Sequence, residues 1–266
     1  MIIGNEDWNS YRELARDVVS KALRDLEGRG WGNAGVLSDS GRDLKTEADF
    51  QSDAILKNGL SNSPFPIISE ESSTNSIVEE NQITWIIDPL DGTVNFERGF
   101  PHAAVSVGLW CGGKPLFGVV GNLKDGTIWE DRGPQDLLKS GQHVCVSSVQ
   151  RDENGVLATG FPTSRDFSDR SLLSSAQIWR CFKKVRMIGS AALSLAMVAD
   201  GTFDAYCEEG IWWWDVAGGV PLVLTGGGRV WMTPPDAALK RVVFASNGRI
   251  TPPSELFELY ENLEEY

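Results

Sequence analysis

Apolar residues recur every three or four positions between Trp8 and Leu26, and charged residues occupy many of the positions between them. This spacing places the apolar side chains on one face, so it predicts an amphipathic helix that ends near Gly28. Segment 46–60, TEADFQSDAILKNGL, returns to the same helical period. The glycine- and serine-rich stretch between the two helices, residues 28–43, predicts a loop.

The period of the pattern changes in the middle of the chain. Three runs rich in β-branched and aromatic residues follow one another across short glycine-containing turns: AAVSVGLW (103–110), KPLFGVVGN (114–122) and GTIWED (126–131). Such runs predict a meander of antiparallel strands. Beyond residue 145, strand-like and helical runs alternate. We therefore predict two parts, an α+β half over residues 1–145 and an α/β half over residues 146–266.

Composition and charge narrow the class of protein. With 266 residues, 41% of them hydrophobic, the chain is large enough to bury a sizeable core. A formal net charge of -13, without any run rich in lysine and arginine, argues against nucleic acid as a partner. The chain shows no signal-peptide pattern and no apolar run of about 18 residues, so we expect a cytoplasmic protein without a membrane partner. The scattered cysteines fit neither a disulfide framework nor a zinc site.

Acidic residues end the apolar run 85–87, where Asp88 and Asp91 are followed directly by Gly92 and Thr93. Carboxylate oxygens bind a hard cation, and free backbone N–H groups bind an anion, so the stretch suits a phosphate bridged by Mg²⁺. The alternative is a tight turn, in which the aspartates bond their own backbone and Gly92 supplies a positive φ.

Two further apolar runs also end in acid. Glu70 and Glu71 follow the strand-like FPIIS, and Asp215 follows the aromatic IWWW. Two carboxylates about 4 Å apart repel each other by roughly 4 kcal/mol at an effective dielectric constant of 20. If the three segments converge, a bound cation is therefore required.

Three short blocks carry a family resemblance: SEE (69–71), DPLDGTVNF (88–96) and WDVAGG (214–219). They resemble the signature blocks of the inositol monophosphatase family, Mg²⁺-dependent and lithium-sensitive phosphatases that also include fructose-bisphosphatases and bisphosphate nucleotidases. DLKTEAD, ATGFP and GSAALSLAMVADGTFDAYCE also follow the family's order. The resemblance implies a layered αβαβα sandwich, a phosphoric monoester hydrolase and a homodimer. The resemblance also implies that the N-terminal half contains most metal-binding motifs and that the C-terminal half completes the active site.

The resemblance assigns the metal ligands residue by residue. Glu70, Asp88 and the carbonyl of Leu90 correspond to ligands of a first Mg²⁺. Asp88, Asp91 and Asp215 correspond to ligands of a second Mg²⁺. A third, weaker ion would involve Glu70, so two or three Mg²⁺ are expected in each active site.

The same resemblance assigns the phosphate and the attacking water. The backbone N–H groups of Gly92 and Thr93 correspond to those that hold the phosphate. The Thr93 hydroxyl is paired with Asp49, and together with Glu70 they would orient and deprotonate the attacking water. No covalent protein nucleophile is then needed.

The substrate alcohol is expected to meet Gly189, Ser190, Ala191 and Glu208. An acceptor-only carboxylate suits a polyol, which offers many O–H donors. The expected reaction is the hydrolysis of inositol monophosphate to inositol and phosphate. The alternatives are a fructose-1,6-bisphosphatase, another sugar-phosphate or 3′-phosphonucleotide phosphatase, and a regulatory binding protein of the same fold.

Three features depart from the family pattern. Residues 38–40 are Ser-Asp-Ser where many relatives carry a lysine, so Lys45 is the candidate for positive charge beside the phosphate. The family's glycine-rich turn is degraded over residues 131–143, which leaves that edge and the dimer contact open. Trp212 and Trp213 either narrow the substrate pocket or belong to the core, and we favour the core because large buried aromatics mostly pack.

Overall fold

The computed structural model describes residues 8–40, 43–72, 81–161, 167–236, 238–260 and 262–266. The helices are α1 (Trp8–Arg29), α2 (Glu47–Leu60), α3 (Thr93–Arg98), α4 (Asp169–Trp179), α5 (Ala191–Ala199), α6 (Trp213–Ala217), α7 (Gly219–Thr225) and α8 (Ser254–Leu259), with a 3-10 turn η1 (Asp152–Asn154). The strands are β1 (Val36–Ser40), β2 (Asp43–Thr46), β3 (Ile67–Ser69), β4 (Ile83–Asp91), β5 (Ala104–Cys111), β6 (Lys114–Asn122), β7 (Ile128–Asp131), β8 (Leu137–Lys139), β9 (Gln142–His143), β10 (Val156–Thr159), β11 (Lys184–Arg186), β12 (Ala205–Trp212), β13 (Arg229–Met232), β14 (Lys240–Ser246) and β15 (Glu264–Glu265).

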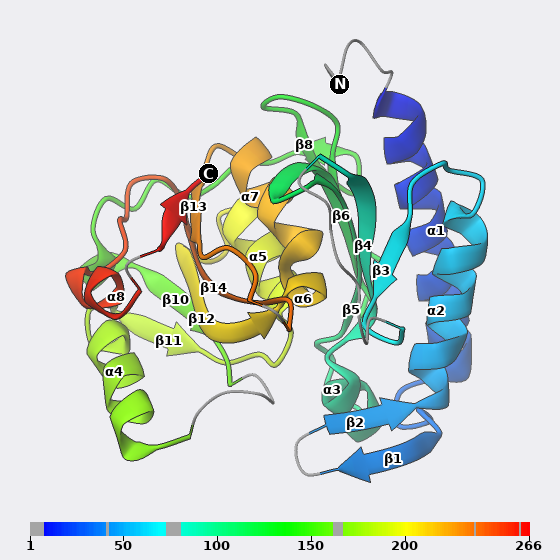
Figure 1. The fold of residues 1–266 in the computed structure, drawn as a ribbon, viewed down its shortest axis with the longest axis horizontal. Coiled ribbons are helices and arrows are strands. Elements are labelled where there is room, and N and C mark those ends of the chain that lie inside the picture. Colours follow the sequence, from blue (N-terminus) through cyan, green and yellow to red (C-terminus); the bar gives the residue numbers. More distant parts are fainter. Residues whose placement is uncertain (1–7, 41–42, 73–80, 162–166, 237, 261) are drawn as a thin grey trace.

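Helices and sheets alternate in five layers, which confirms the predicted αβαβα sandwich (Figure 1). Helices α1 and α2 cover one face of a seven-stranded sheet, and α5, α6 and α7 cover its other face. A six-stranded sheet follows, with α4 and α8 on its far side. The central helices contact both sheets, so side chains from both sheets can meet there.

The seven-stranded sheet has the order β3-β4-β5-β6-β7-β8-β9. Strand β3 pairs parallel to β4, and the later neighbours are antiparallel, as the predicted meander requires. The periodic face of α1 buries residues such as Ala15, Val19 and Leu26 against this sheet. The regular patterns of the N-terminal half therefore folded as the sequence predicts.

The six-stranded sheet has the order β11-β10-β12-β14-β13-β15. Strand β10 is parallel to β11 and β12, while β14 is antiparallel to β12 and β13. One large apolar cluster joins this sheet, the central helices and the seven-stranded sheet, from Ile86 through Leu195 to Val243. The division into halves at residues 1–145 and 146–266 stays a prediction, and this shared core connects the two parts.

Two strand glycines let α6 approach the seven-stranded sheet closely. A Cβ atom at Gly108 of β5 would lie 2.2 Å from the carbonyl oxygen of Ala217, and one at Gly118 of β6 would lie 2.1 Å from that of Gly218. The indole N–H of Trp110 donates to the Ala217 carbonyl at 2.9 Å. The backbone at the end of α6 is thus fixed against the sheet, and α6 carries an acidic residue of the site.

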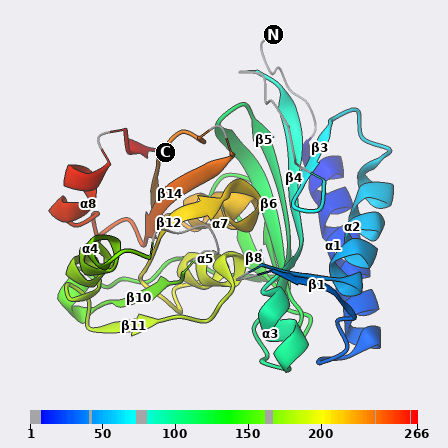
Figure 2. The same ribbon diagram turned by 60° about the horizontal axis from the view of Figure 1, so that its bottom comes forward.

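The predicted loop over residues 28–43 is wrong in part. Strands β1 and β2 form a hairpin beside α3, although every residue of β1 is exposed (Figure 2). Strand β1 forms by backbone pairing with β2 and has no buried side of its own, so no alternation of apolar residues marks it. None of the described helices combines the length and apolar character that crossing a bilayer requires.

Candidate active site

An irregularity in β4 explains how Asp88 and Asp91 serve one site. Asp88 pairs with Ser106 and Asp91 with Ala104, so β4 contains one more residue than β5 over this interval. Side chains three positions apart on a regular strand point to opposite faces, whereas a bulge re-aims them. The Leu90 N–H donates to Asp88 Oδ1 at 3.0 Å and holds the turn.

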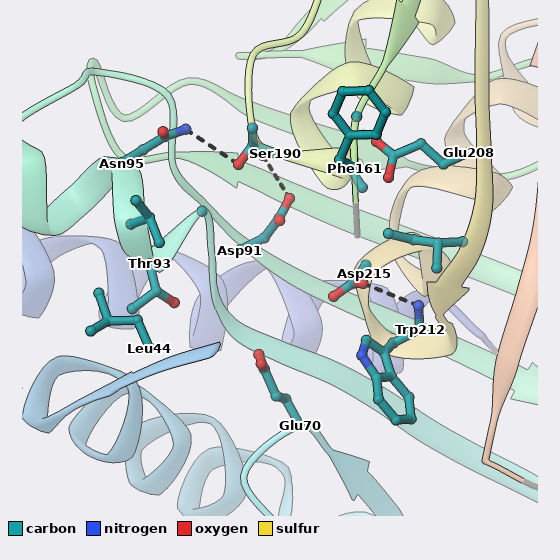
Figure 3. A pocket seen from close by; sticks show the side chains of 16 residues that line it. Leu44, Glu70, Asp91, Thr93, Asn95, Phe161, Ser190, Glu208, Trp212 and Asp215 are labelled. Atoms are coloured by element: carbon teal, nitrogen blue, oxygen red, sulfur yellow. Dashed lines mark hydrogen bonds between the residues drawn. The ribbon is translucent and has the colours of Figure 1, made fainter. Parts of the chain in front are cut away.

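Asp91 is fixed by the second half of the chain. Its Oδ2 accepts the Ser190 hydroxyl at 2.6 Å and the Ala192 N–H at 2.7 Å, both at the start of α5 (Figure 3). The positive end of the α5 dipole favours a carboxylate here. These bonds fix the orientation of the Asp91 carboxylate.

Glu70 and Asp215 complete the acidic group from two other segments. Glu70 follows β3, and Asp215 lies in the first turn of α6, where it accepts the Trp212 backbone N–H at 3.2 Å. The carboxyl groups of Glu70, Asp91 and Asp215 line a single pocket of about 360 Å³ (Figure 3). The three acid-ended runs of the sequence therefore converge, as the prediction requires.

The pKa values of these acids reflect their burial and, for Glu70, Asp88 and Asp215, the charge of neighbouring carboxylates. Burial, and then the neighbouring Glu71, raises the pKa of Glu70 to about 8. Burial raises the pKa of Asp91 to about 6. Burial, and then the charge of Glu70, raises the pKa of both Asp88 and Asp215 well above the ordinary value. Carboxylates that disfavour one another's charge in this way are what a bound cation would stabilise.

The oxygen atoms of the site are of the kind that a hard metal ion binds. Carboxylates and a backbone carbonyl are the hard oxygen ligands that Mg²⁺ takes in proteins, and each comes from a fixed turn or helix start. Among the described residues, no three His, Cys, Asp or Glu side chains already lie in the compact geometry of a bound ion. The chemistry of the residues fits Mg²⁺, and the individual ligand assignments stay a prediction.

Beside the acids lies a set of free backbone donors. Gly92 has a φ of 91°, and a Cβ atom there would lie 2.8 Å from the carbonyl oxygen of His102, so the turn needs glycine. The N–H groups of Gly92 and Thr93 precede the first turn of α3, and no acceptor in the described part of the chain takes either of them. Both residues line the pocket, where they can bind a phosphate oxygen.

The Thr93 hydroxyl lies 2.8 Å from Asp49 Oδ1 and 3.0 Å from the Leu90 carbonyl oxygen. Asp49 is positioned by a capping box at the start of α2, where its Oδ2 accepts the Thr46 N–H at 2.8 Å. Burial raises the pKa of Asp49, although hydrogen bonds from Thr46 and Thr93 oppose the rise. The structure therefore brings Thr93 and Asp49 together as expected.

The C-terminal half supplies the far side of the pocket. Gly189, Ser190, Ala191 and Glu208 all line it. Asn95 of α3 donates its amide N–H groups to the carbonyls of Ile188 at 2.8 Å and Gly189 at 3.2 Å. This contact ties α3 to the segment that precedes α5.

The sequence matches a known protein family over most of its length. A family model described as "Inositol monophosphatase family" matches residues 8–265. The chain belongs to the inositol monophosphatase family. It is 32% identical over 246 residues to inositol-1-monophosphatase SuhB of Mycobacterium tuberculosis, with 85% of each chain covered. It is 35% identical over 225 residues to inositol monophosphatase 1 of Homo sapiens, with 80% of each chain covered.

A solved structure of inositol monophosphatase from Anabaena (Nostoc) sp. matches this fold with a TM-score of 0.78 at 28% identity. The match covers 92% of this chain and 93% of that one. The layered fold described above is thus the fold of the inositol monophosphatase family.

Lys45, the candidate for positive charge beside the phosphate, lies next to the acids of the site. Lys45 does not line the pocket, and its ammonium lies 2.9 Å from Glu71 Oε2. Its charge nevertheless opposes the rise in the pKa of Glu70. A role for Lys45 beside the phosphate stays a prediction, as does the homodimer.

The two extra tryptophans behave differently from each other. Trp213 is 1% exposed and belongs to the central apolar cluster, as favoured from the sequence. Trp212 is half-buried and lines the pocket, so assigning it only to the core is wrong. Trp212 is the last residue of β12, where the strand turns into α6, and this position turns its side chain towards the site.

Sequence reasoning also missed Phe161 and Leu44 as pocket residues. Phe161 is 40% exposed, unusually high for a phenylalanine that follows a buried strand. Its place in the ATGFP block, just after a strand end, is the signal that could have identified it.

The raised pKa values predict how stability depends on pH in EDTA. In the folded state the pKa of Glu70 is raised to about 8 and that of Asp91 to about 6, whereas the ordinary pKa values of these groups are 4.5 and 3.8. Between these limits the folded state binds more protons than the unfolded state, so stability falls as pH rises. The melting temperature in EDTA should decrease from pH 5 to pH 8, and Glu70→Gln should flatten the decrease above pH 6. A melting temperature that rises over this range contradicts the crowding of the acids.

Proposed function

We propose that this protein is a Mg²⁺-dependent phosphomonoesterase that acts on inositol monophosphate or a closely similar small polyol phosphate. The observation that carries the proposal is the meeting of two groups in one pocket. Glu70, Asp91 and Asp215 line the pocket together with the unpaired N–H groups at the start of α3, and the charge of the buried Asp88 is coupled to these three acids. Such a site matches an anion that is bound together with cations.

The proposed metal ligands are the residues that correspond to those of the inositol monophosphatase family. Glu70, Asp88 and the Leu90 carbonyl would hold one Mg²⁺, and Asp88, Asp91 and Asp215 would hold a second. Bound Mg²⁺ would neutralise phosphate oxygens, lower the pKa of a bound water and stabilise the departing alkoxide. The residues of the chain position the reacting groups, which is most of the task for a phosphate monoester.

Thr93 and Asp49 are proposed to orient the attacking water. When the Thr93 hydroxyl donates to Asp49 Oδ1 at 2.8 Å, its lone pairs are left to accept an O–H of the water. Glu70 lies across the pocket and would take the proton of that water. The N–H groups of Gly92 and Thr93 would hold the phosphate for attack in line with the leaving alcohol.

Glu208 is proposed to recognise the alcohol. It lies on the far side of the pocket from Thr93, and a Cβ atom at Gly160 would approach its Oε1 to 2.4 Å (Figure 3). Glycine at 160 thus leaves room for the carboxylate, which can accept hydroxyl groups of a polyol.

A substrate panel tests the proposal. Phosphate release by the purified protein with Mg²⁺ should be faster with inositol 1-phosphate than with fructose 1,6-bisphosphate or 3′-phosphoadenosine 5′-phosphate. A preference for the nucleotide of about tenfold or more, which is about 1.4 kcal/mol in transition-state binding, rejects the polyol assignment.

Metal removal is a separate test. EDTA should abolish phosphate release, and excess Mg²⁺ should restore it, because the carboxylates alone repel the phosphate. Millimolar lithium should inhibit the Mg²⁺-loaded enzyme if the family's lithium sensitivity extends to this chain. Full activity in EDTA rules out the metal-dependent mechanism.

A further inference from the structure

Two aromatic side chains line the pocket on the same side as Glu208, with Phe161 beside Glu208 and Trp212 beside Asp215. Figure 3 shows Phe161, Glu208 and Trp212 across the pocket from Thr93 and Leu44. The acids and the N–H groups account for the metal ions and the phosphate. The two aromatic side chains are therefore left to meet the alcohol part of the substrate.

Trp212 is held firmly in this position. Its ring is stacked on Trp214, with ring centroids 4.8 Å apart and planes 9° apart. The ammonium of Lys240 lies 4.7 Å from the centroid of the Trp212 ring. Its backbone N–H is bonded to Asp215, so the side chain is placed next to a proposed metal ligand.

The indole N–H of Trp212 is available to a ligand. Figure 3 shows its nitrogen on the side of the ring that faces into the pocket. The indole nitrogens of the neighbouring Trp213 and Trp214 are buried instead. Trp212 thus offers the pocket a rigid apolar ring and one hydrogen-bond donor.

Phe161 is supported from behind. Its ring centroid lies 5.6 Å from that of Trp179 on α4 and 5.8 Å from that of Phe167. With 40% of its surface exposed, it presents an apolar face to the pocket. Two aromatic rings and a carboxylate along one side of a pocket combine contacts for C–H groups with an acceptor for hydroxyl groups.

We infer, on the basis of the proposed function, that Trp212 and Phe161 are specificity determinants that select phosphates of cyclic polyols over those of acyclic alcohols. A ring presents a rigid C–H surface to the two aromatic side chains while its hydroxyls reach Glu208 and the Trp212 N–H. An acyclic alcohol has no fixed surface of this kind, and it loses more conformational entropy on binding.

The test compares two substrates with the same reacting group. Inositol 1-phosphate carries a ring, and glycerol 2-phosphate is acyclic. Trp212→Ala and Phe161→Ala should each lower kcat/KM for inositol 1-phosphate about tenfold, mainly through KM, and change that for glycerol 2-phosphate less than about threefold. Trp212→Phe keeps an aromatic ring and loses the N–H donor, so its loss should be smaller, about threefold. Phe257→Ala, at an exposed aromatic on α8 outside the pocket, is the matched control and should change neither value.

The outcomes separate this inference from the proposed function. If the wild-type protein hydrolyses both substrates and the Trp212 and Phe161 variants lose both activities equally, or neither, the inference is overturned while the phosphatase proposal stands. If the wild-type protein with Mg²⁺ hydrolyses neither substrate, the proposed function fails and the inference fails with it. Melting temperatures of the variants identify a loss due to misfolding, and Trp212→Phe then decides the result, because it retains the stacked ring.

Discussion

Replacement of Asp88 by asparagine should lower kcat/KM at saturating Mg²⁺ by at least about 100-fold. This is the upper end of the effect of removing a residue that only supports a metal ligand, and Asp88 is proposed to contact both ions directly. Asparagine keeps the shape of the side chain and can still accept the Leu90 N–H. The loss should therefore come from the missing charge and appear in steady-state phosphate release.

The same variant should be more stable than the wild type in EDTA. Asp88 is 1% exposed, and burial together with Glu70, Asp91 and Asp215 disfavours its charge. Removing the charge should raise the melting temperature by a few °C, at roughly 2–4 °C for each kcal/mol in a protein near this size. Mg²⁺ should then stabilise the variant less than it stabilises the wild type.

Asp131→Asn is the matched control for Asp88→Asn. Burial raises the pKa of Asp131 to about 6, but its partners are Thr225 and Arg12, and it does not line the pocket. Its replacement should leave kcat/KM within about threefold of the wild type. An equal loss of activity in both variants would show that any buried acid is sensitive, and would remove the case for a special role of Asp88.

Replacement of Gly108 by alanine should strongly destabilise the fold. The new Cβ atom would lie 2.2 Å from the Ala217 carbonyl oxygen and 2.9 Å from the Trp110 indole nitrogen. Because a backbone atom blocks the space, α6 has to move away from β5. Overpacking of this kind costs about 3 kcal/mol at the upper end of the usual range, or roughly a 6 °C or greater loss in melting temperature.

This substitution should also weaken Mg²⁺ binding, because α6 carries Asp215. Calorimetric titration of Gly108→Ala with Mg²⁺ should give a larger Kd than the wild type at a temperature where both are folded. Gly28→Ala is the control, because no atom lies within 4 Å of its added Cβ and its helical position favours alanine by about 0.5–1 kcal/mol. Wild-type stability and Mg²⁺ affinity in Gly108→Ala contradict the close contact between α6 and the sheet.

The sequence predicted the elements in which a periodic pattern coincides with burial. Helix α1 and strands β5 and β6 appear where their apolar residues recur, because each buries one or both faces in a core. The β1–β2 hairpin was missed because its stability comes from backbone pairing, and its exposed residues carry no alternation. The hydrophobic pattern of the sequence therefore predicts an element only where burial of side chains, and not backbone pairing, stabilises it.

The sequence indicated the acidic residues of the pocket but not its aromatic side chains. A carboxylate at the end of an apolar run is costly to bury without a partner, so Asp88, Asp91 and Asp215 stood out from the sequence alone. A tryptophan at a strand end suits either a core or a pocket. Only the turn from β12 into α6 separates Trp212, which lines the pocket, from Trp213, which is buried. The irregular pairing of β4 that aligns Asp88 with Asp91 is likewise a tertiary feature.

Crystals grown with Mn²⁺ and phosphate test the central claim most directly. Mn²⁺ takes the same oxygen ligands as Mg²⁺ and gives an anomalous signal. The account predicts anomalous peaks coordinated by Glu70, Asp88, Asp91 and Asp215, with phosphate density at the N–H groups of Gly92 and Thr93. A map at full Mn²⁺ saturation with no peak among these carboxylates, or with peaks only elsewhere, contradicts it.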